Sequence, residues 1–253
     1  MPGPVVREIE AKSVLNVSKI YDYCVNPYTG CQVGCAYCYA ALFMRRYSGH
    51  SEPWGEFVDA KINAPELLAK QIARARRGTI WFSSVCDGYQ PVEERYGLTR
   101  RSLEVLAGRE FPVVIQTKSA RVRRDLDVIK RIPHVEVGFS IASDDEAVIR
   151  LFERASSPVE ERIEVLREFK AAGVPTFAFA GPLLPGNPER LAARLAGAVD
   201  RVLIDRMNYV PAVRAVYARH GLLEALTDGF FATQASRLAK ALRARGIRVE
   251  KVF

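Results

Sequence analysis

The stretch PELLAKQIARARRGTIWFSSV, Pro65 to Val85, joins a helical pattern directly to a mostly apolar run. Proline stands near the expected helix start, apolar residues recur at helical spacing, and Gly78 ends the pattern. The run Thr79–Val85 that follows has the composition of a strand covered on both faces of a sheet. The stretch therefore predicts a helix that covers a parallel sheet, followed by one of that sheet's strands.

The same alternation repeats along the rest of the chain, which predicts an α/β fold. With a first strand at Tyr21–Asn26, the count reaches about six βα units, and right-handed crossovers turn such a series into an open doubly wound sheet or a barrel. The further expected helices and strands are LTRRSLEVLAG (98–108) and PVVIQT (112–117), RVRRDLDVIKRI (121–132) and VEVGFSI (135–141), SPVEERIEVLREFKAAG (157–173) and VPTFAFA (174–180), and NPERLAARLAGAV (187–199) and DRVLID (200–205).

Length and composition favour one folded domain. The 253 residues are 49% hydrophobic and 26% charged, which excludes a disordered or fibrous chain. No apolar run approaches the ~20 residues that cross a bilayer, and the start MPGPVVREIE lacks the apolar core of a signal peptide, so a cytoplasmic protein without membrane contact is expected. After residue 206 we expect an extension with a long helix, FFATQASRLAKALRARG (230–246), and a last strand at 248–253.

The net charge of +8 favours contact with polyanions such as nucleic acid, although scattered arginines also fit the solvated outer faces of helices.

The cysteines of the chain indicate a metal site. Three of the five cysteines lie within NPYTGCQVGCAYCYA (26–40), at Cys31, Cys35 and Cys38, which is a poor disulfide framework and fits a set of metal ligands. An iron–sulfur cluster, a structural zinc site closed by Cys24, Cys86 or His50, and a group of core cysteines are the alternatives.

Four segments together resemble one protein family. The cysteine spacing CxxxCxxC after a first strand, with Tyr37 before the last cysteine, is similar to the signature of the radical S-adenosylmethionine (SAM) superfamily. With it, DGYQPVEERYGLTRRSLEVL, TKSARVRRDLDVI and FERASSPVEERIEVLREFKAAGVP resemble the spore-photolyase-like branch. The matching segments run from about Ser13 to Asp205, so the resemblance implies a single domain with a core at about 13–205, a partial (βα)6 TIM-type barrel, and a C-terminal helical extension at about 206–253.

The resemblance also implies cofactors and partners. Cys31, Cys35 and Cys38 would hold a [4Fe–4S] cluster whose open iron binds the amino and carboxylate groups of S-adenosylmethionine. Reductive cleavage of that cofactor would give a 5′-deoxyadenosyl radical that acts on a substrate which the sequence does not identify, nucleic acid among the candidates. Such an enzyme would take electrons from a donor of the flavodoxin or ferredoxin type. The rival hypothesis is a non-catalytic nucleic-acid-binding protein that zinc or an iron–sulfur cluster stabilises.

Polar residues and glycines follow the expected strands, at the edge where parallel α/β folds place their chemistry. Asp87 can accept hydrogen bonds from a cofactor ammonium or cap a turn, and Lys118 can pair with a carboxylate or lie on the surface. By resemblance, the cofactor-binding residues are Tyr37, Asp87, Lys118, Ser140, Ala180 and Gly181. Of the neighbouring acids we expect Glu93 and Glu94 to be solvated and Asp125 to form an ion pair on a helix face or in the packing, without a catalytic role.

One departure from the photolyases concerns their hydrogen-donor cysteine. It lies three residues before the aspartate, where this chain has Ser84, whereas Cys86 directly precedes Asp87. Cys86 is therefore the candidate catalytic hydrogen donor, with packing in the core as the alternative. A DNA-engaging hairpin is not identifiable in the sequence, which makes lesion repair doubtful.

Overall fold

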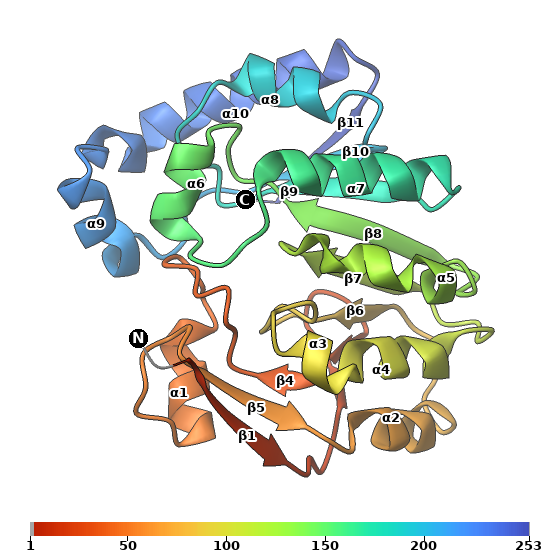
Figure 1. Ribbon diagram of the computed structural model, residues 1–253. Coiled ribbons are helices and arrows are strands. Elements are labelled where there is room, and N and C mark those ends of the chain that lie inside the picture. The colour runs from red at the N-terminus through yellow and green to blue at the C-terminus, as the bar shows by residue number, and fades with distance from the viewer. Residues whose placement is uncertain (1–2, 253) are drawn as a thin grey trace. The chain divides into compact units, whose positions relative to one another are not determined.

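The computed structural model describes residues 3–252, which form two compact units (Figure 1). Unit 1 comprises the chain up to Gly34 together with Cys38–Glu136. Unit 2 comprises Cys35–Tyr37 together with the chain from Val137 onward. The cysteine loop thus contributes three residues to unit 2 and its remainder to unit 1.

The main sheet of unit 1 contains the first strands of the expected series. Strand β3 (Tyr23–Val25) pairs in parallel with β6 (Ile80–Phe82), which pairs in parallel with β7 (Val113–Thr117). A short strand that the sequence did not predict, β2 (Leu15–Val17), adds to β3 in the antiparallel sense. Val25, Ile80, Phe82 and Ile115 are buried, so this sheet forms part of the core, as its apolar runs predicted.

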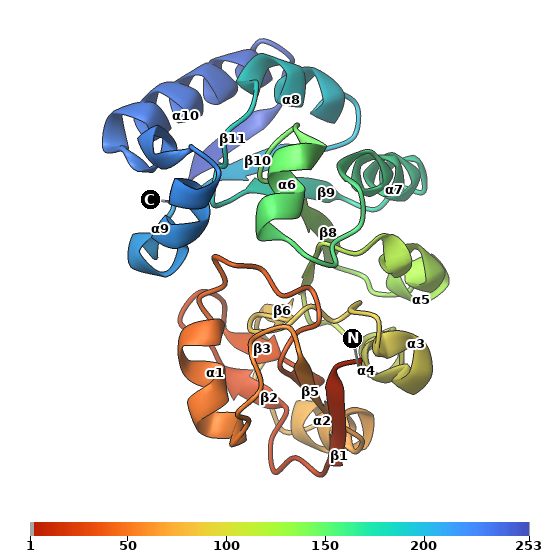
Figure 2. The same cartoon turned by 60° about the vertical axis from the view of Figure 1, so that its left-hand side comes forward.

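A second sheet in unit 1 was not expected from the sequence. Strand β1 (Val5–Ile9) runs parallel to β5 (Phe57–Lys61) (Figure 2). The short β4 (Tyr28–Thr29) pairs with the other edge of β5 (Figure 1). Gly30 follows β4 with a φ of 85°, and a Cβ there would lie 2.4 Å from the carbonyl oxygen of Phe57. Glycine is therefore required where the chain leaves this sheet and enters the cysteine loop.

The helices of unit 1 largely follow the predicted pattern. Helix α2 begins at the predicted proline turn, and α4 lies beside it. The predicted helix at 121–132 begins instead as a 3-10 helix, and the Ser119 side chain caps its start by accepting the Arg121 N–H. The bounds are α1 (Ala41–Ser48), α2 (Ala64–Ile72), α3 (Glu93–Tyr96), α4 (Leu98–Leu106), the 3-10 helix η1 (Ala120–Asp125) and α5 (Leu126–Ile129).

Unit 2 contains the later strands, all parallel. Strand β8 (Val135–Ser140) pairs with β9 (Thr176–Ala180), which pairs with β10 (Arg201–Ile204). The predicted last strand is present as β11 (Arg248–Lys251), beside β10. The Phe177 ring covers Gly138 so closely that a Cβ there would lie 2.2 Å from it, which explains a glycine in the middle of β8.

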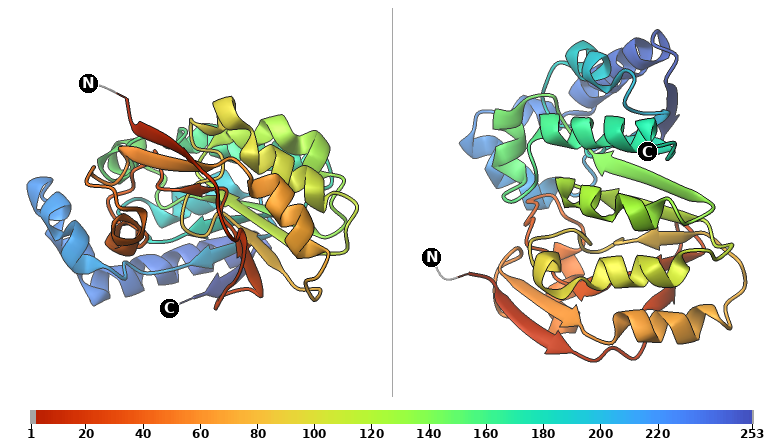
Figure 3. Two further views of the ribbon diagram at one scale, coloured as in Figure 1. Left: turned by 90° about the horizontal axis from the view of Figure 1, so that it is seen from below. Right: turned by 45° about the vertical axis from the view of Figure 1, so that its right-hand side comes forward.

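The helices of unit 2 have well-defined starts. Asp145, Asn187 and Thr227 each accept backbone N–H groups as N-caps. Helices α8 and α10 pack side by side (Figure 3). Across the described residues, the structure contains no helix with the length and apolarity to span a bilayer. The bounds are α6 (Glu146–Phe152), α7 (Val159–Ala171), α8 (Pro188–Leu195), α9 (Val210–Arg219), the 3-10 helix η2 (Leu223–Leu226) and α10 (Asp228–Arg243).

Candidate functional site

The cysteine loop lies between β4 and helix α1. Cys31 and Cys35 are buried and Cys38 is half-buried, and no disulfide joins any of the five cysteines, all of which lie within residues 3–252. Burial raises the pKa of the Cys38 thiol, while the backbone N–H groups of Ala40 and Ala41 and the charge of Lys118 act in the opposite direction. Two N–H donors of the loop and the charge of Lys118, which follows β7, thus favour the negative charge that this sulfur would carry as a metal ligand.

The Asp87 side chain links the loop after strand β6 to the end of β7 through hydrogen bonds. Its carboxylate accepts the Tyr89 N–H at 2.9 Å, the Thr117 hydroxyl at 2.6 Å and the Lys118 N–H at 2.7 Å. Its own backbone N–H donates to the Cys31 sulfur at 3.3 Å. Three of the roughly four acceptor positions of a carboxylate are therefore used within the chain. Asp87 acts as a turn cap, the alternative considered from the sequence, and its contact with a cofactor stays a prediction.

Cys86 lies against apolar side chains. It packs on a cluster formed by Tyr28, Val58, Ala60, Val92 and Leu98. Its sulfur lies 3.7 Å from the Asn26 side-chain oxygen, and burial raises the pKa of its thiol to about 12. The sulfur therefore keeps its hydrogen at neutral pH, which both a hydrogen donor and a packed core thiol require.

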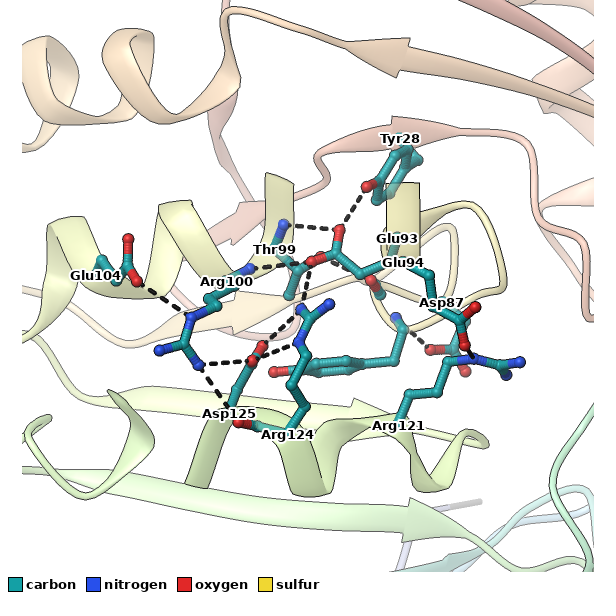
Figure 4. Close-up of polar contacts among 12 residues, drawn as sticks. Tyr28, Asp87, Glu93, Glu94, Thr99, Arg100, Glu104, Arg121, Arg124 and Asp125 are labelled. Atoms are coloured by element: carbon teal, nitrogen blue, oxygen red, sulfur yellow. Dashed lines mark hydrogen bonds and ion pairs between the residues drawn. The ribbon is translucent and has the colours of Figure 1, made fainter. Parts of the chain in front are cut away.

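The acids after Asp87 differ sharply from one another. Glu93 was expected to be solvated, and that prediction is wrong. Its side chain is 1% exposed and accepts the Tyr28 hydroxyl, two backbone N–H groups and Arg124, because it caps the start of α4 (Figure 4). Glu94 is exposed and pairs with Arg121, in agreement with its prediction. The buried Asp125 pairs with Arg100 and Arg124, as expected of a packing ion pair.

In unit 2, Tyr37 and Ser140 share a chain of buried polar contacts. The Tyr37 hydroxyl donates to Glu153, and Glu153 pairs with Arg162 at 2.7 Å. Arg162 in turn donates to the carbonyl oxygen of Ser140 at 2.8 Å, at the end of β8. Burial and the neighbouring Glu153 raise the pKa of Tyr37 well above its usual range, so the phenol stays protonated and donates.

Ala180 is the last residue of strand β9, and Gly181 directly follows it. Ala180 is buried, and its carbonyl oxygen accepts the Asp205 N–H at 3.1 Å. A Cβ at Gly181 would lie 2.4 Å from the Phe179 ring and 2.9 Å from the Asp205 Cβ, so this position has room only for glycine. Ser140 pairs with Phe179, which places the ends of β8 and β9 side by side in the sheet. Three of the predicted cofactor residues therefore lie on one edge of the unit 2 sheet.

The residues fit an iron–sulfur cluster by the chemistry of their donors. Three thiols in one loop, with N–H groups directed at Cys31 and Cys38, are a donor set for a cubane. As placed within residues 3–252, neither these three thiols nor any other group of three or more His, Cys, Asp and Glu is arranged to hold a metal ion, so the fit is one of donor chemistry and sequence spacing. His50, which might have closed a zinc site, has each ring nitrogen 2.9 Å from a carboxylate oxygen, of Glu52 and of Asp59.

Four residues of this region were missed from the sequence. Thr117 is the last residue of β7 and Asp205 directly follows β10, so the rule that places chemistry at the carboxyl ends of parallel strands could have found both. Glu153 and Arg162 lie within a segment quoted for its resemblance, but no local pattern marks them as buried. Besides these four, Tyr39 of the cysteine segment donates its hydroxyl to the Ser84 carbonyl and so ties the cysteine loop to the segment that follows β6.

Comparison with known proteins gives a consistent result. The model of the radical SAM superfamily matches residues 25–197. A protein of Methanocaldococcus jannaschii, "Uncharacterized protein MJ0683", is 36% identical over 180 residues, which cover 70% of this chain and 67% of that protein. The "Radical SAM Nalpha-GlyT isomerase" of Pseudomonas phage M6 is 24% identical over 239 residues, which cover 88% of this chain and 48% of the phage protein.

Solved structures agree on the fold. Spore photoproduct lyase complexed with dinucleoside spore photoproduct matches 98% of this chain and 82% of its own with a TM-score of 0.72, at 15% sequence identity. The likeness confirms the expected α/β fold, the partial barrel of the radical SAM type.

Proposed function

Because the chain belongs to the radical SAM superfamily, we propose that it is an enzyme that cleaves S-adenosylmethionine reductively and directs the resulting radical at a second substrate. The cysteine loop carries this proposal. Its three thiols have the spacing of the family signature and lie within the matched residues 25–197. We assign Cys31, Cys35 and Cys38 as ligands of a [4Fe–4S] cluster that leaves one iron open for the amino and carboxylate groups of the cofactor.

The cluster and the cofactor would supply the radical chemistry, and residues of this chain would bind and orient the cofactor. When bound, the reduced cluster would supply the electron that breaks the sulfonium C–S bond and leaves a 5′-deoxyadenosyl radical. In this proposal Lys118 pairs with the cofactor carboxylate, Ser140 faces the methionyl or ribose part, and Ala180 and Gly181 receive adenine. Asp87 would hold the strand ends and the Cys31 sulfur in place, and it has one acceptor position left for the cofactor ammonium.

Two further assignments concern the second substrate. Cys86 is proposed as the hydrogen donor to a product radical, since its raised thiol pKa keeps a hydrogen on the sulfur. Nucleic acid is the substrate class favoured by the net charge of +8 and by the bound dinucleoside in the similar spore photoproduct lyase structure. A reductant is required by radical SAM enzymes, and we propose a donor of the flavodoxin or ferredoxin type.

Metal content tests the proposal. After anaerobic reconstitution with iron and sulfide, we expect about four irons per chain and a broad absorbance near ~400 nm. Substituting alanine for Cys31, Cys35 or Cys38 should abolish the cluster. Cys24→Ala is the matched control and should leave the iron content unchanged. One tightly held zinc and no iron in the wild type would instead support a stabilised binding protein.

The substrate class has its own test. Single-stranded and duplex oligonucleotides should bind the reconstituted enzyme with an affinity that falls steeply as salt rises, because basic side chains displace counterions from phosphates. If the oligonucleotides bind with an affinity that does not change with salt, or do not bind even in low salt, the substrate class would be a peptide or a small metabolite in place of nucleic acid.

A further inference from the structure

A buried ion pair in unit 2 has no role in the function proposed above. Glu153 directly follows α6, and Arg162 lies in the first half of α7. Both side chains are 0% exposed, and Arg162 is the largest fully buried side chain in the described part of the chain. Removing two charges from water is costly, and burial of this kind is compensated only when both groups are fully hydrogen-bonded.

Arg162 uses every nitrogen of its guanidinium group. Nη2 lies 2.7 Å from Glu153 Oε2, Nη1 lies 2.8 Å from the carbonyl oxygen of Ser140, and Nε lies 2.7 Å from the carbonyl oxygen of Ser157. This arrangement fixes one oxygen of the Glu153 carboxylate and the end of strand β8. The other carboxylate oxygen, Oε1, accepts a different donor.

That donor is Tyr37, the aromatic residue between Cys35 and Cys38. Its hydroxyl donates to Glu153 Oε1, and its ring packs against Phe152 with centroids 6.5 Å apart. The backbone N–H of Ala36 donates to the Phe152 carbonyl at 2.8 Å. Residues 35–37 are therefore held at the end of α6 by a backbone bond, a ring contact and a hydrogen bond to a buried charge.

We propose that Glu153 and Arg162 are positioning residues: they fix the Tyr37 phenol and thereby set the conformation of the chain between Cys35 and Cys38. The inference rests on the proposed function, since that function makes the two cysteines cluster ligands. Arg162 holds Glu153, Glu153 holds the phenol, and the same guanidinium holds the Ser140 carbonyl. One buried pair thus anchors both the cysteine loop and a strand end assigned to the cofactor.

The test measures how firmly the cluster is held, independently of turnover. Glu153→Gln and Tyr37→Phe are reconstituted anaerobically as full chains, and iron release to an excess of chelator is followed by absorbance. Each variant should release iron about tenfold faster than the wild type, the factor expected from losing a hydrogen bond to a buried charge. The double variant should be no faster than the faster single variant, because both changes remove the same contact.

A spectroscopic measurement and a matched control separate positioning from general loss of stability. The EPR line shape of the dithionite-reduced cluster should change in Glu153→Gln and Tyr37→Phe. Asp200→Asn is the control: Asp200 lies at the start of β10, at the opposite end of the strands, and binds Lys170 at 3.0 Å and the Thr176 N–H at 2.8 Å. It should lower the urea midpoint yet keep the wild-type EPR line shape and release iron within about twofold of wild type.

The outcomes are distinct. Iron release and EPR spectra like those of the wild type in both single variants would overturn the inference and leave the proposed function intact. Equal acceleration in Asp200→Asn would also overturn it, since the effect would then follow stability alone. A wild type that assembles no cluster would defeat the proposed function, and the inference with it. If Glu153→Gln fails to fold, Tyr37→Phe decides, because it removes one hydroxyl and leaves the ion pair in place.

Discussion

Replacing Glu93 with alanine should cost unit 1 more stability than most single substitutions. The Glu93 carboxylate accepts four donors: the Tyr28 hydroxyl, the Thr99 N–H at 3.0 Å, the Arg100 N–H at 3.2 Å and Arg124 Nη2 at 2.9 Å. Arg124 is 38% exposed and keeps Asp125 as a partner, but the Tyr28 hydroxyl and the two N–H groups would lose their acceptor. A buried donor left without an acceptor costs about 1–3 kcal/mol, so the three together should cost about 3–5 kcal/mol after partial relaxation. We expect a loss in the free energy of unfolding within that range.

The assay is urea unfolding of the apoprotein followed by far-UV circular dichroism. With an m-value of about 3 kcal/mol/M for a chain of this size, the midpoint should fall by about 1–1.7 M. The adjacent Glu94→Ala is the matched control. Glu94 is 64% exposed and pairs with Arg121 on the surface, so its loss should cost less than about 1 kcal/mol. Equal midpoints for the two variants would refute the reasoning about the buried carboxylate.

Three other perturbations have defined outcomes. Gly181→Ala should destabilise the chain by about 1–3 kcal/mol through overpacking, whereas Gly229→Ala, with open space around it, should not, as urea midpoints will show. At pH 8 the Cys86 thiol, with its pKa raised to about 12 by burial, should resist alkylation in the folded apoprotein, and rapid labelling detected by mass spectrometry would contradict this. Hydrogen bonds from Arg100 lower the pKa of Asp127 to about 2. The stability that the ionised Asp127 contributes is therefore present above about pH 4 and lost as the pH falls toward 2. Asp127→Asn should remove that part of the pH dependence of the free energy of unfolding.

The strands and most helices were predictable because their signals are local. The apolar runs that became β7, β8 and β9, and the proline turn of α2, each encode their own conformation. The pairing of β1 with β5 was not predictable, since it joins Val5–Ile9 to Phe57–Lys61 across a segment with no pattern of its own. Sequence periodicity identifies a strand and leaves its partner unspecified.

The same limit applies to the candidate site. Two adjacent glutamates look alike in sequence, and Glu93 is buried only because Tyr28 and Arg124, 65 and 31 residues away, converge on it. Glu153 is likewise defined by Tyr37, 116 residues away. By contrast, the cysteine spacing lies within a single loop, so the sequence alone was sufficient to propose the three cluster ligands.

The measurement that tests the proposed chemistry most directly is the release of 5′-deoxyadenosine. Reconstituted protein is incubated anaerobically with dithionite and S-adenosylmethionine, and the products are quantified by chromatography, with Cys35→Ala as the control. We predict 5′-deoxyadenosine from the wild type and none from the variant. A protein that carries about four irons yet releases no 5′-deoxyadenosine, with or without oligonucleotides, would contradict the assignment of a radical SAM enzyme activity to this chain.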